Sequence, residues 1–264
     1  MRSNLSLQRV CQFVVVLAAI LLSFNRQGFA DDSAPEIGTA VTIKRQVVAT
    51  LGEEKRDLQE GGRVHRSEYL ETGNEAQAEL KLDDQTKLAL GPNAGLKLDD
   101  FVIGKSGGVT SIGVNFIKGT FRFITGSEKK DAYRIDTPSA TIGVRGTVFD
   151  VYVDGNGDTL VLLHEGEVDI CTKTHTCRRH NTVGRIVRAT VGGILSAPLK
   201  FSKDLIPGLG VGTAFPFVGK TLRIDPIRRL KTADIIADPA TKAGRSIAKG
   251  AGDIGRSLRK AIPF

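Results

Sequence analysis

The chain has 264 residues, a formal net charge of +8 at neutral pH and a hydrophobic fraction of 41%. This length is ample for one sizeable core, or for one domain with an extension. The 30 glycines and the absence of tryptophan argue against a helical bundle and favour a turn-rich β protein.

The first segment has the pattern of a cleaved export signal. Arg2 and Arg9 precede an apolar run of about 15 residues, shorter than the ~20 that a membrane-spanning helix needs. Gln27-Gly28-Phe29-Ala30 then places small residues before a cleavage point. We therefore expect residues 1–30 to be a signal peptide and the mature protein to be periplasmic. The alternative is an uncleaved segment that anchors the chain in the inner membrane, facing the periplasm.

Short strands separated by turns are predicted from residue 36 to residue 190. Residues 76–82 alternate strictly between apolar and polar side chains, and residues 86–90 alternate again after a polar turn. A Gly-Pro-Asn turn at 91–95 precedes another strand at 96–101. Turns at this spacing are typical of a sandwich, barrel or β-solenoid. We predict a mainly β domain at 36–190.

The stretch from Asp136 to Val151 is the most distinctive of the chain. It begins with a turn at Thr137-Pro138, continues to Gly143-Val144-Arg145-Gly146, and then alternates as a half-buried strand through Thr147 and Phe149. Arg145, on an apolar run between two glycines, needs an acceptor for its guanidinium. We expect a structural contact to a carbonyl or carboxylate, with contact to an anion or a partner as the alternative.

This stretch resembles the signature of the FecR domain family, and its flanks appear in the family's order. Leu70-Glu71-Thr72-Gly73 comes first, Gly119-Thr120-Phe121-Arg122-Phe123 follows, and Glu165-Gly166-Glu167-Val168 comes last. The resemblance covers roughly residues 37–171. It implies a solenoid-like or sandwich-like all-β architecture.

The resemblance also bears on function. Better-known members carry an N-terminal cytoplasmic anti-sigma segment and a membrane anchor. They pass a signal from an outer-membrane transporter, often for iron-siderophores, to a sigma factor. Only nine residues precede the apolar run of this chain. We therefore expect a stand-alone exported FecR-domain protein without the anti-sigma segment, acting as a binding module of the periplasm or cell envelope. A component of FecR-type transmembrane signalling is the alternative.

Two groups of residues suggest weaker metal sites. Asp154, Asn156 and Asp158 alternate as in a calcium loop, but Thr159 stands where a glycine is needed, so a hairpin turn is favoured. Cys171 and Cys177 are expected to form a disulfide in an oxidising compartment. A zinc site that adds His175 and His180 to these cysteines is the alternative. His65 and His164 are expected at ordinary surface or strand positions.

Charged residues are distributed unevenly along the chain. Residues 31–171 carry 16 Lys and Arg against 24 Asp and Glu, whereas residues 172–264 carry 18 against 5. We predict a basic C-terminal extension at 191–264, with an extended, partly apolar segment at 192–217 and short helices at 228–237 and 240–262. The extension either folds back over its own acidic domain or contacts an acidic protein, an envelope polymer or a membrane surface. Nucleic acid is not expected, because aromatic stacking platforms are absent.

No catalytic constellation is found in the sequence. Asp136-Thr137 is followed by proline rather than the glycine of aspartic proteases, and no Ser-His-Asp order or paired carboxylates stand out. We expect a non-enzymatic protein without a cofactor.

Overall fold

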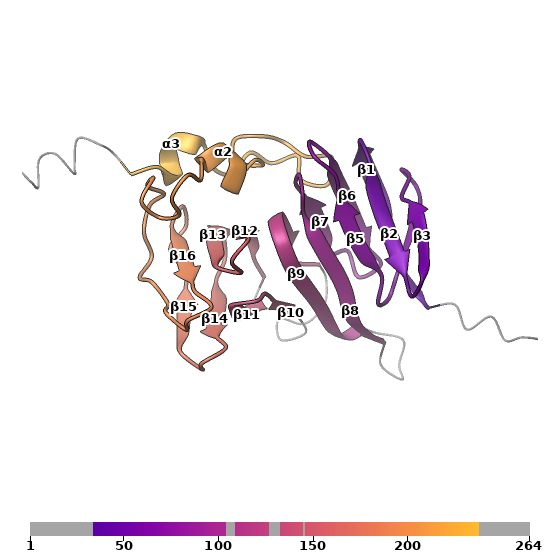
Figure 1. Cartoon of the computed structure of the whole chain (residues 1–264), viewed down its shortest axis with the longest axis horizontal. Coiled ribbons are helices and arrows are strands. Elements are labelled where there is room, and N and C mark those ends of the chain that lie inside the picture. The colour runs from indigo at the N-terminus through magenta and orange to yellow at the C-terminus, as the bar shows by residue number, and fades with distance from the viewer. Residues whose placement is uncertain (1–33, 104–108, 127–132, 145, 238–264) are drawn as a thin grey trace, which may run out of the picture. The chain divides into compact units, whose positions relative to one another are not determined.

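The computed structural model describes residues 34–103, 109–126, 133–144 and 146–237 (Figure 1). The chain divides into two compact units, Met1–Ala34 and Pro35–Phe264, and the second contains every strand of the described residues. Arg145 and the predicted signal peptide lie outside the described residues, as does the predicted helix at 240–262.

The strands of the second unit form two sheets that share β9. In spatial order, the first sheet, called sheet A, contains β4 (Arg63–His65), β1 (Glu36–Lys44), β6 (Gln77–Leu82), β7 (Lys87–Leu90), β9 (Val109–Ile124), β12 (Val148–Val153), β13 (Thr159–Glu165) and β16 (Ile186–Ala189). Sheet B contains β3 (Glu54–Asp57), β2 (Val47–Leu51), β5 (Tyr69–Thr72), β8 (Gly95–Ile103), β9, β10 (Tyr133–Asp136), β11 (Ala140–Val144), β14 (Val168–Thr172) and β15 (Cys177–His180). The pairing of β9 with β10 is parallel, and the other ladders are antiparallel.

Strand β9 passes from one sheet to the other at Gly119. Before this residue β9 pairs with β8 and β10, and after it β9 pairs with β7 and β12. Gly119 has a φ of +87°, and a Cβ atom there would lie 2.6 Å from the Cα of Ala94. Because only glycine tolerates both conditions, this residue permits the bend that joins the sheets.

The main core lies between the two sheets. It is built from alternate residues of their strands, among them the five aromatic residues Phe116, Phe121, Phe123, Tyr133 and Phe149. The rings of Phe116 and Phe121, on either side of Gly119, stack with centroids 4.1 Å apart. The mainly β fold class predicted from the sequence is confirmed.

The outer face of sheet A is also buried, which the alternation in the sequence did not predict. In β13 six successive residues are buried, because Val161 and Leu163 enter the main core while Leu160 and Leu162 enter a second cluster. Glu79 of β6 is one of the polar residues in the alternation of 76–82, yet it is 2% exposed. A further layer of chain therefore covers sheet A.

That layer is residues 191–237, the described part of the predicted extension, which we call the strap. Figure 1 shows it in orange and yellow, running past β16, β13 and β12 toward β7 and β6. Its helices are single turns, α2 (Val211–Ala214) and α3 (Thr232–Ile235). The helix expected at 228–237 is thus confined to four residues, and the rest of the strap is extended or turned. None of the helices in the described part of the chain is long and apolar enough to span a membrane.

Candidate functional site

The first half of the signature closes the turn that precedes β11. The side chains of Ser139, Thr159 and Thr137 form a buried relay, in which Ser139 Oγ donates to Thr159 Oγ1 at 2.7 Å and Thr159 Oγ1 donates to Thr137 Oγ1 at 2.9 Å. Thr137 Oγ1 in turn donates to the carbonyl of Ala140 at 3.0 Å. Pro138 is exposed between these anchored residues. The hydroxyls therefore fix the turn.

The second half carries the chain from β11 in sheet B to β12 in sheet A. Val144 is buried in the core, and Gly143 lies on the outer face of β11. Gly146 has a φ of +68°, and the carbonyl of this residue would lie 2.4 Å from a Cβ atom on Gly166. The close approach explains the glycine at position 166, because a side chain there would separate the strands, and the positive φ favours glycine at position 146.

Thr147 and Phe149 complete this crossover. Thr147 N–H donates to Thr125 Oγ1 at 2.8 Å, and the Phe149 ring packs on that of Phe123 with centroids 5.4 Å apart. The described residues of the signature thus have structural roles. Arg145 is outside the described residues, so the contact expected for its guanidinium stays a prediction.

Asp154, Asn156 and Asp158 lie in the turn between β12 and β13. Asp154 Oδ1 accepts hydrogen bonds from the backbone N–H groups of Asn156 and Asp158, at 2.8 and 2.9 Å. Asp158 Oδ2 accepts from Arg188 Nη2 at 2.6 Å. These carboxylates organise a hairpin turn and its neighbours. Among the residues that the structure describes, no group of three His, Cys, Asp or Glu side chains is placed to hold a metal ion.

Cys171 and Cys177 form a disulfide between β14 and β15, as expected. Their sulfurs are therefore not available as the thiolates of the alternative zinc site. His180 is buried, and its Nε2 donates to the carbonyl of Arg185 at 3.0 Å. Burial lowers the pKa of His180 below its ordinary value, because the charged ring would be poorly solvated.

A buried ionic cluster, which was not predicted from the sequence, lies on the outer face of sheet A. Arg122 of β9 forms a bidentate pair with Asp150 of β12, with Nε–Oδ1 at 2.6 Å and Nη2–Oδ2 at 2.9 Å. His164 Nε2 lies 3.0 Å from Asp150 Oδ2 and 3.1 Å from Arg122 Nη2. These three side chains are between 0% and 3% exposed.

The strap completes this cluster. Arg122 Nη1 donates to Asp225 Oδ2 at 3.4 Å, and Arg229 pairs with the other oxygen of the same carboxylate. The guanidinium of Arg122 also lies over the ring of Phe217, 5.8 Å from its centroid. Burial alone would raise the pKa of Asp150, but His164 and Arg122 outweigh it and hold that pKa well below its ordinary value. The buried charges of Arg122, Asp150 and Asp225 are therefore paired with one another. Pairing is needed because an isolated charge is costly to remove from water.

Other contacts fix the strap along its length. Glu79 Oε2 accepts the backbone N–H of Ile224 at 2.9 Å, which explains the burial of this carboxylate. Thr120 Oγ1 donates to the carbonyl of Ala214 at 3.1 Å. Apolar strap residues cover the apolar part of the face: Phe201, Leu205, Phe215, Phe217, Leu222, Ile224 and Leu230. Of the alternatives predicted for the extension, residues 191–237 therefore fold back over their own domain.

The outer face of sheet B differs, because charged side chains remain exposed on it. The strand registers align Gly113, Arg134, Gly143, Asp169 and Arg179 in one row across five strands. Arg179 Nε lies 3.0 Å from Asp169 Oδ1 in that row. The side chains of Arg134 and Arg179 are 66% and 54% exposed.

A second row runs beside the first, from Asn115 through Asp136 and Thr141 to Cys171 and Cys177. Asp136 receives hydrogen bonds from Thr141, from Arg134 and from Lys173 of the β14–β15 turn. Burial opposes ionisation of Asp136, but these donors prevail and lower its pKa. The face therefore presents fixed charges of both signs.

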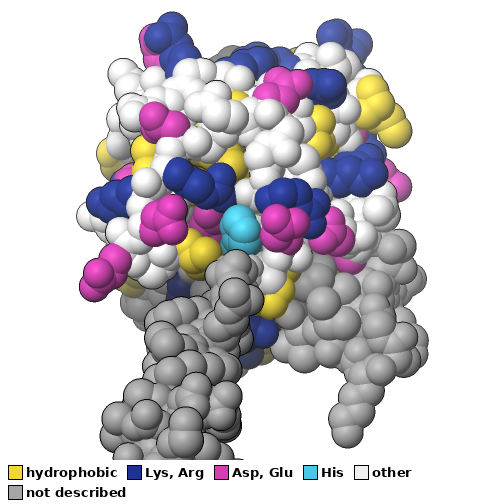
Figure 2. All heavy atoms as spheres, turned by 90° about the vertical axis from the view of Figure 1, so that its right-hand side faces the viewer, with side chains coloured by type: hydrophobic (Ala, Val, Ile, Leu, Met, Phe, Trp, Pro, Cys, Tyr) yellow, Lys and Arg dark blue, Asp and Glu magenta, His cyan; other side chains and the backbone are white. Residues whose placement is uncertain are grey.

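A third surface, over β1–β3, is also polar. Figure 2 shows Lys and Arg side chains interspersed with Asp and Glu on this side. Arg63 lies 2.8 Å from Glu36 and 2.9 Å from Asp83, and Arg45 lies 2.9 Å from Glu75. The opposite charges on this surface are paired with one another, as Arg179 and Asp169 are on sheet B.

Comparison with known proteins identifies the domain. Residues 68–169 match the model of the family described as FecR protein. Two crystal structures of a candidate anti-sigma factor from Parabacteroides distasonis ATCC 8503 share 14% sequence identity with this chain, with TM-scores of 0.40 and 0.41. Each match covers 48% of this chain and 57% of the other, so less than two thirds of that protein is matched. None of the curated proteins matches the chain in sequence.

The fold and the signature define an all-β domain in which two sheets are joined through one shared strand. Residues 68–169 of this domain match the FecR family, as the resemblance predicted.

Proposed function

We propose that this protein is a non-catalytic binding module of the periplasm or cell envelope, and that it binds a partner through the outer face of sheet B and the adjoining edge strand β15. One observation carries this proposal: the strap occupies the outer face of sheet A, whereas charged rows stay exposed on sheet B. Exposed, organised charge favours specific recognition and rapid association. The buried Arg122–Asp150–His164 cluster is shielded from substrates by the strap, which supports a non-enzymatic role.

Strand β15 offers a defined mode of binding. The Cα atoms of Cys171 and Cys177 are 4.0 Å apart, as in the closely spaced, non-hydrogen-bonded pairs of an antiparallel ladder. By the alternation of such a ladder, the backbone N–H and C=O groups of Cys177 and Arg179 point away from β14. An extended segment of a partner can pair with these groups and add a strand to sheet B.

The charge of this edge indicates the class of partner. Arg178 and Arg179 are exposed on β15, and Lys173 is exposed on the preceding turn. Arginines on an edge also discourage pairing between copies of the same chain, since like charges would meet. We therefore infer a protein partner whose extended segment is acidic, with an anionic envelope polymer as the alternative ligand of the same surface.

The proposed location rests on the export pattern of residues 1–30 and on the disulfide, because disulfides persist in oxidising compartments. A periplasmic protein cleaved after Ala30 would expose β15 to envelope partners. An inner-membrane anchor formed by the uncleaved segment would leave the same surface facing the periplasm. Contact of the basic residues beyond 237 with a membrane surface also stays a prediction.

The binding surface can be tested by photo-crosslinking in native cells. A benzophenone amino acid in place of Arg178 should give a discrete adduct with one partner, whereas the same group in place of Arg228, an exposed arginine of the strap, should not. Arg178→Glu should weaken binding of that partner at least tenfold, and Arg228→Glu should leave it within twofold. Adducts from position 228 alone, or equal effects of the two reversals, would exclude sheet B as the binding surface.

A second function, participation in FecR-type transmembrane signalling, is favoured by the family match at residues 68–169. In that case the partner would be an outer-membrane transporter for an iron-siderophore, and the output would reach a sigma factor through a further protein. Deletion of the chain should then abolish siderophore-induced transcription from the dependent promoter. Unchanged induction would leave the binding module without this signalling role.

A further inference from the structure

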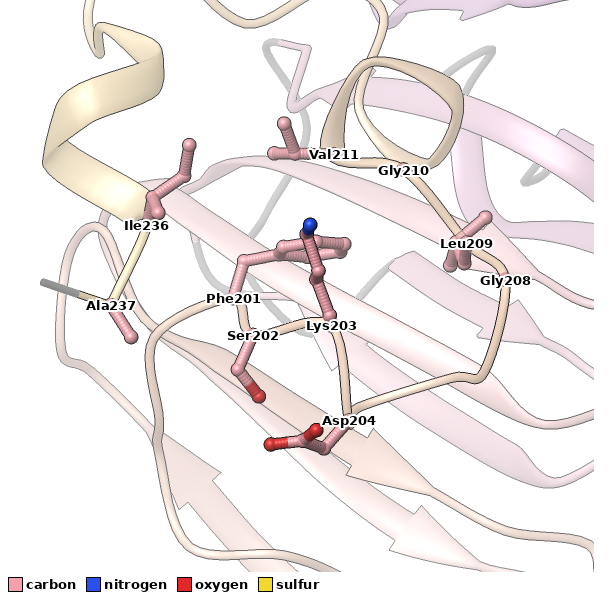
Figure 3. A pocket seen from close by; sticks show the side chains of 10 residues that line it. All are labelled: Phe201, Ser202, Lys203, Asp204, Gly208, Leu209, Gly210, Val211, Ile236 and Ala237. Carbon is pink, nitrogen blue, oxygen red and sulfur yellow. The ribbon is translucent and has the colours of Figure 1, made fainter. Parts of the chain in front are cut away.

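The strap encloses a cavity that neither the FecR domain nor the proposed binding surface uses. Its volume is about 750 Å³, within the range of pockets that hold a small ligand. Apolar side chains form most of the wall, contributed by Phe201, Leu209, Val211, Ile236 and Ala237. Figure 3 shows these residues around the opening, with the Lys203 side chain extending toward its middle and Asp204 below it. Burial of apolar groups in such a site is favourable, because it removes apolar surface from water.

The chain itself enters the wall of this cavity at the end of the strap. Phe201 N–H donates to the carbonyl of Ile235 at 2.7 Å, and Ala237 N–H donates to the carbonyl of Phe201 at 2.9 Å. These bonds on either side of Ile236 fix the direction of the backbone. The described part of the chain therefore ends at Ala237, in the wall of the cavity.

The remaining residues, 238–264, have a composition that suits the cavity. Ile247, Ile254, Leu258 and Ile262 are separated by seven, four and four positions, so they share one side of a segment with helical periodicity. Six Lys and Arg against two Asp flank them. Ten residues from Ala237 to Ile247 span at most ~33 Å extended and ~15 Å as a helix, so either geometry permits a return to the cavity.

We propose that the cavity is the docking site of the chain's own C-terminal segment, residues 238–264, whose apolar side chains fill it. The occupant is covalently attached at the cavity wall, so its effective concentration there is high and no second molecule has to be ordered. Docking would remove from water the apolar side chains of the cavity wall and those of the C-terminal segment.

The test is photo-crosslinking within the purified full chain. A benzophenone amino acid in place of Val211, in the cavity wall, should give intramolecular adducts that mass spectrometry assigns to residues 238–264. The matched control replaces Ile227, which lies on the strap outside the cavity and is 58% exposed, and should give at least tenfold fewer such adducts. If the segment is not docked, the benzophenone groups at positions 211 and 227 should form adducts with it equally often. That result would overturn the proposal.

A second set of variants identifies the side chains responsible. In the Val211-labelled chain, the double substitution Ile254→Asp and Leu258→Asp should abolish the adducts, while Ser257→Asp should keep them, because it adds charge without removing an apolar residue. The probe N-phenyl-1-naphthylamine should then bind the double variant and not the unsubstituted chain. Two results would overturn the proposal. Binding of this probe to the unsubstituted chain would show that the cavity is an open site for small apolar ligands. Adducts from position 211 to a second copy of the chain would show a dimer contact.

Discussion

At the scale of single residues, the ion pair between Arg122 and Asp150 is the most consequential contact outside the main core. Both side chains are almost fully buried, and the strap supplies a third charge through Asp225. Charges in such a place are stable only as a set, because removing one leaves its partner desolvated and unpaired.

We therefore expect Asp150→Asn to lower the free energy of unfolding by about 3–5 kcal/mol. Urea unfolding of the purified protein measures this change. Asp169→Asn is the matched control, because it removes the partner of the exposed Arg179 and should cost less than about 1 kcal/mol. Equal losses in the two variants would contradict the importance assigned to the buried pair.

The same substitution should change the acid dependence of stability. The pKa of Asp150 is depressed in the folded state, so its contribution is present above the unfolded value of about 3.9 and is lost as pH falls toward the folded value. Below pH 4 the unsubstituted protein should therefore lose stability more steeply than Asp150→Asn.

At the scale of elements, the bend of β9 determines how the two sheets meet. Gly119 combines a positive φ with a backbone neighbour too close for a Cβ atom. The phenylalanines that stack across the bend depend on it for their position. The bend is thus the point at which one residue controls the packing of both layers.

We expect Gly119→Ala to destabilise the protein by at least about 2 kcal/mol, because backbone strain and overlap with Ala94 act together. Gly155→Ala is the control: a Cβ atom there meets nothing within 4 Å, and the change should stay within about 0.5 kcal/mol. Thermal unfolding compares the two variants. A Gly119→Ala protein as stable as the control would mean that β9 does not need this bend.

The elements also show what the sequence could and could not predict. The strand at 76–82 and the FecR match could be predicted from the sequence. The alternation, and each motif such as the one around Thr137, consists of residues that are close together in the chain. The cluster on sheet A was missed because its members are distant in sequence, with Arg122 and Asp225 separated by 103 positions. His164 was expected at an ordinary strand position, since alternation cannot show that a later segment covers the outer face.

At the scale of the whole molecule, the strap makes the two faces of the sandwich unequal. The basic extension was expected either to fold back or to bind elsewhere, and the described part folds back onto buried charges and apolar residues. Charge counts alone could not decide between these alternatives, because the deciding contacts are a few specific pairs. This difference between the faces supports the proposal that sheet B and its edge strand bind a partner.

Hydrogen exchange of the full chain, followed by mass spectrometry, tests this account most directly. Because the strap packs as a layer of the fold, peptides covering 214–230 should exchange about as slowly as those of β12 and β13, which lie beneath it. If those strap peptides exchange at the rate of an unfolded chain while β12 and β13 stay protected, the strap is not a layer of the fold. The assignment of sheet B as the free face would then fail with it.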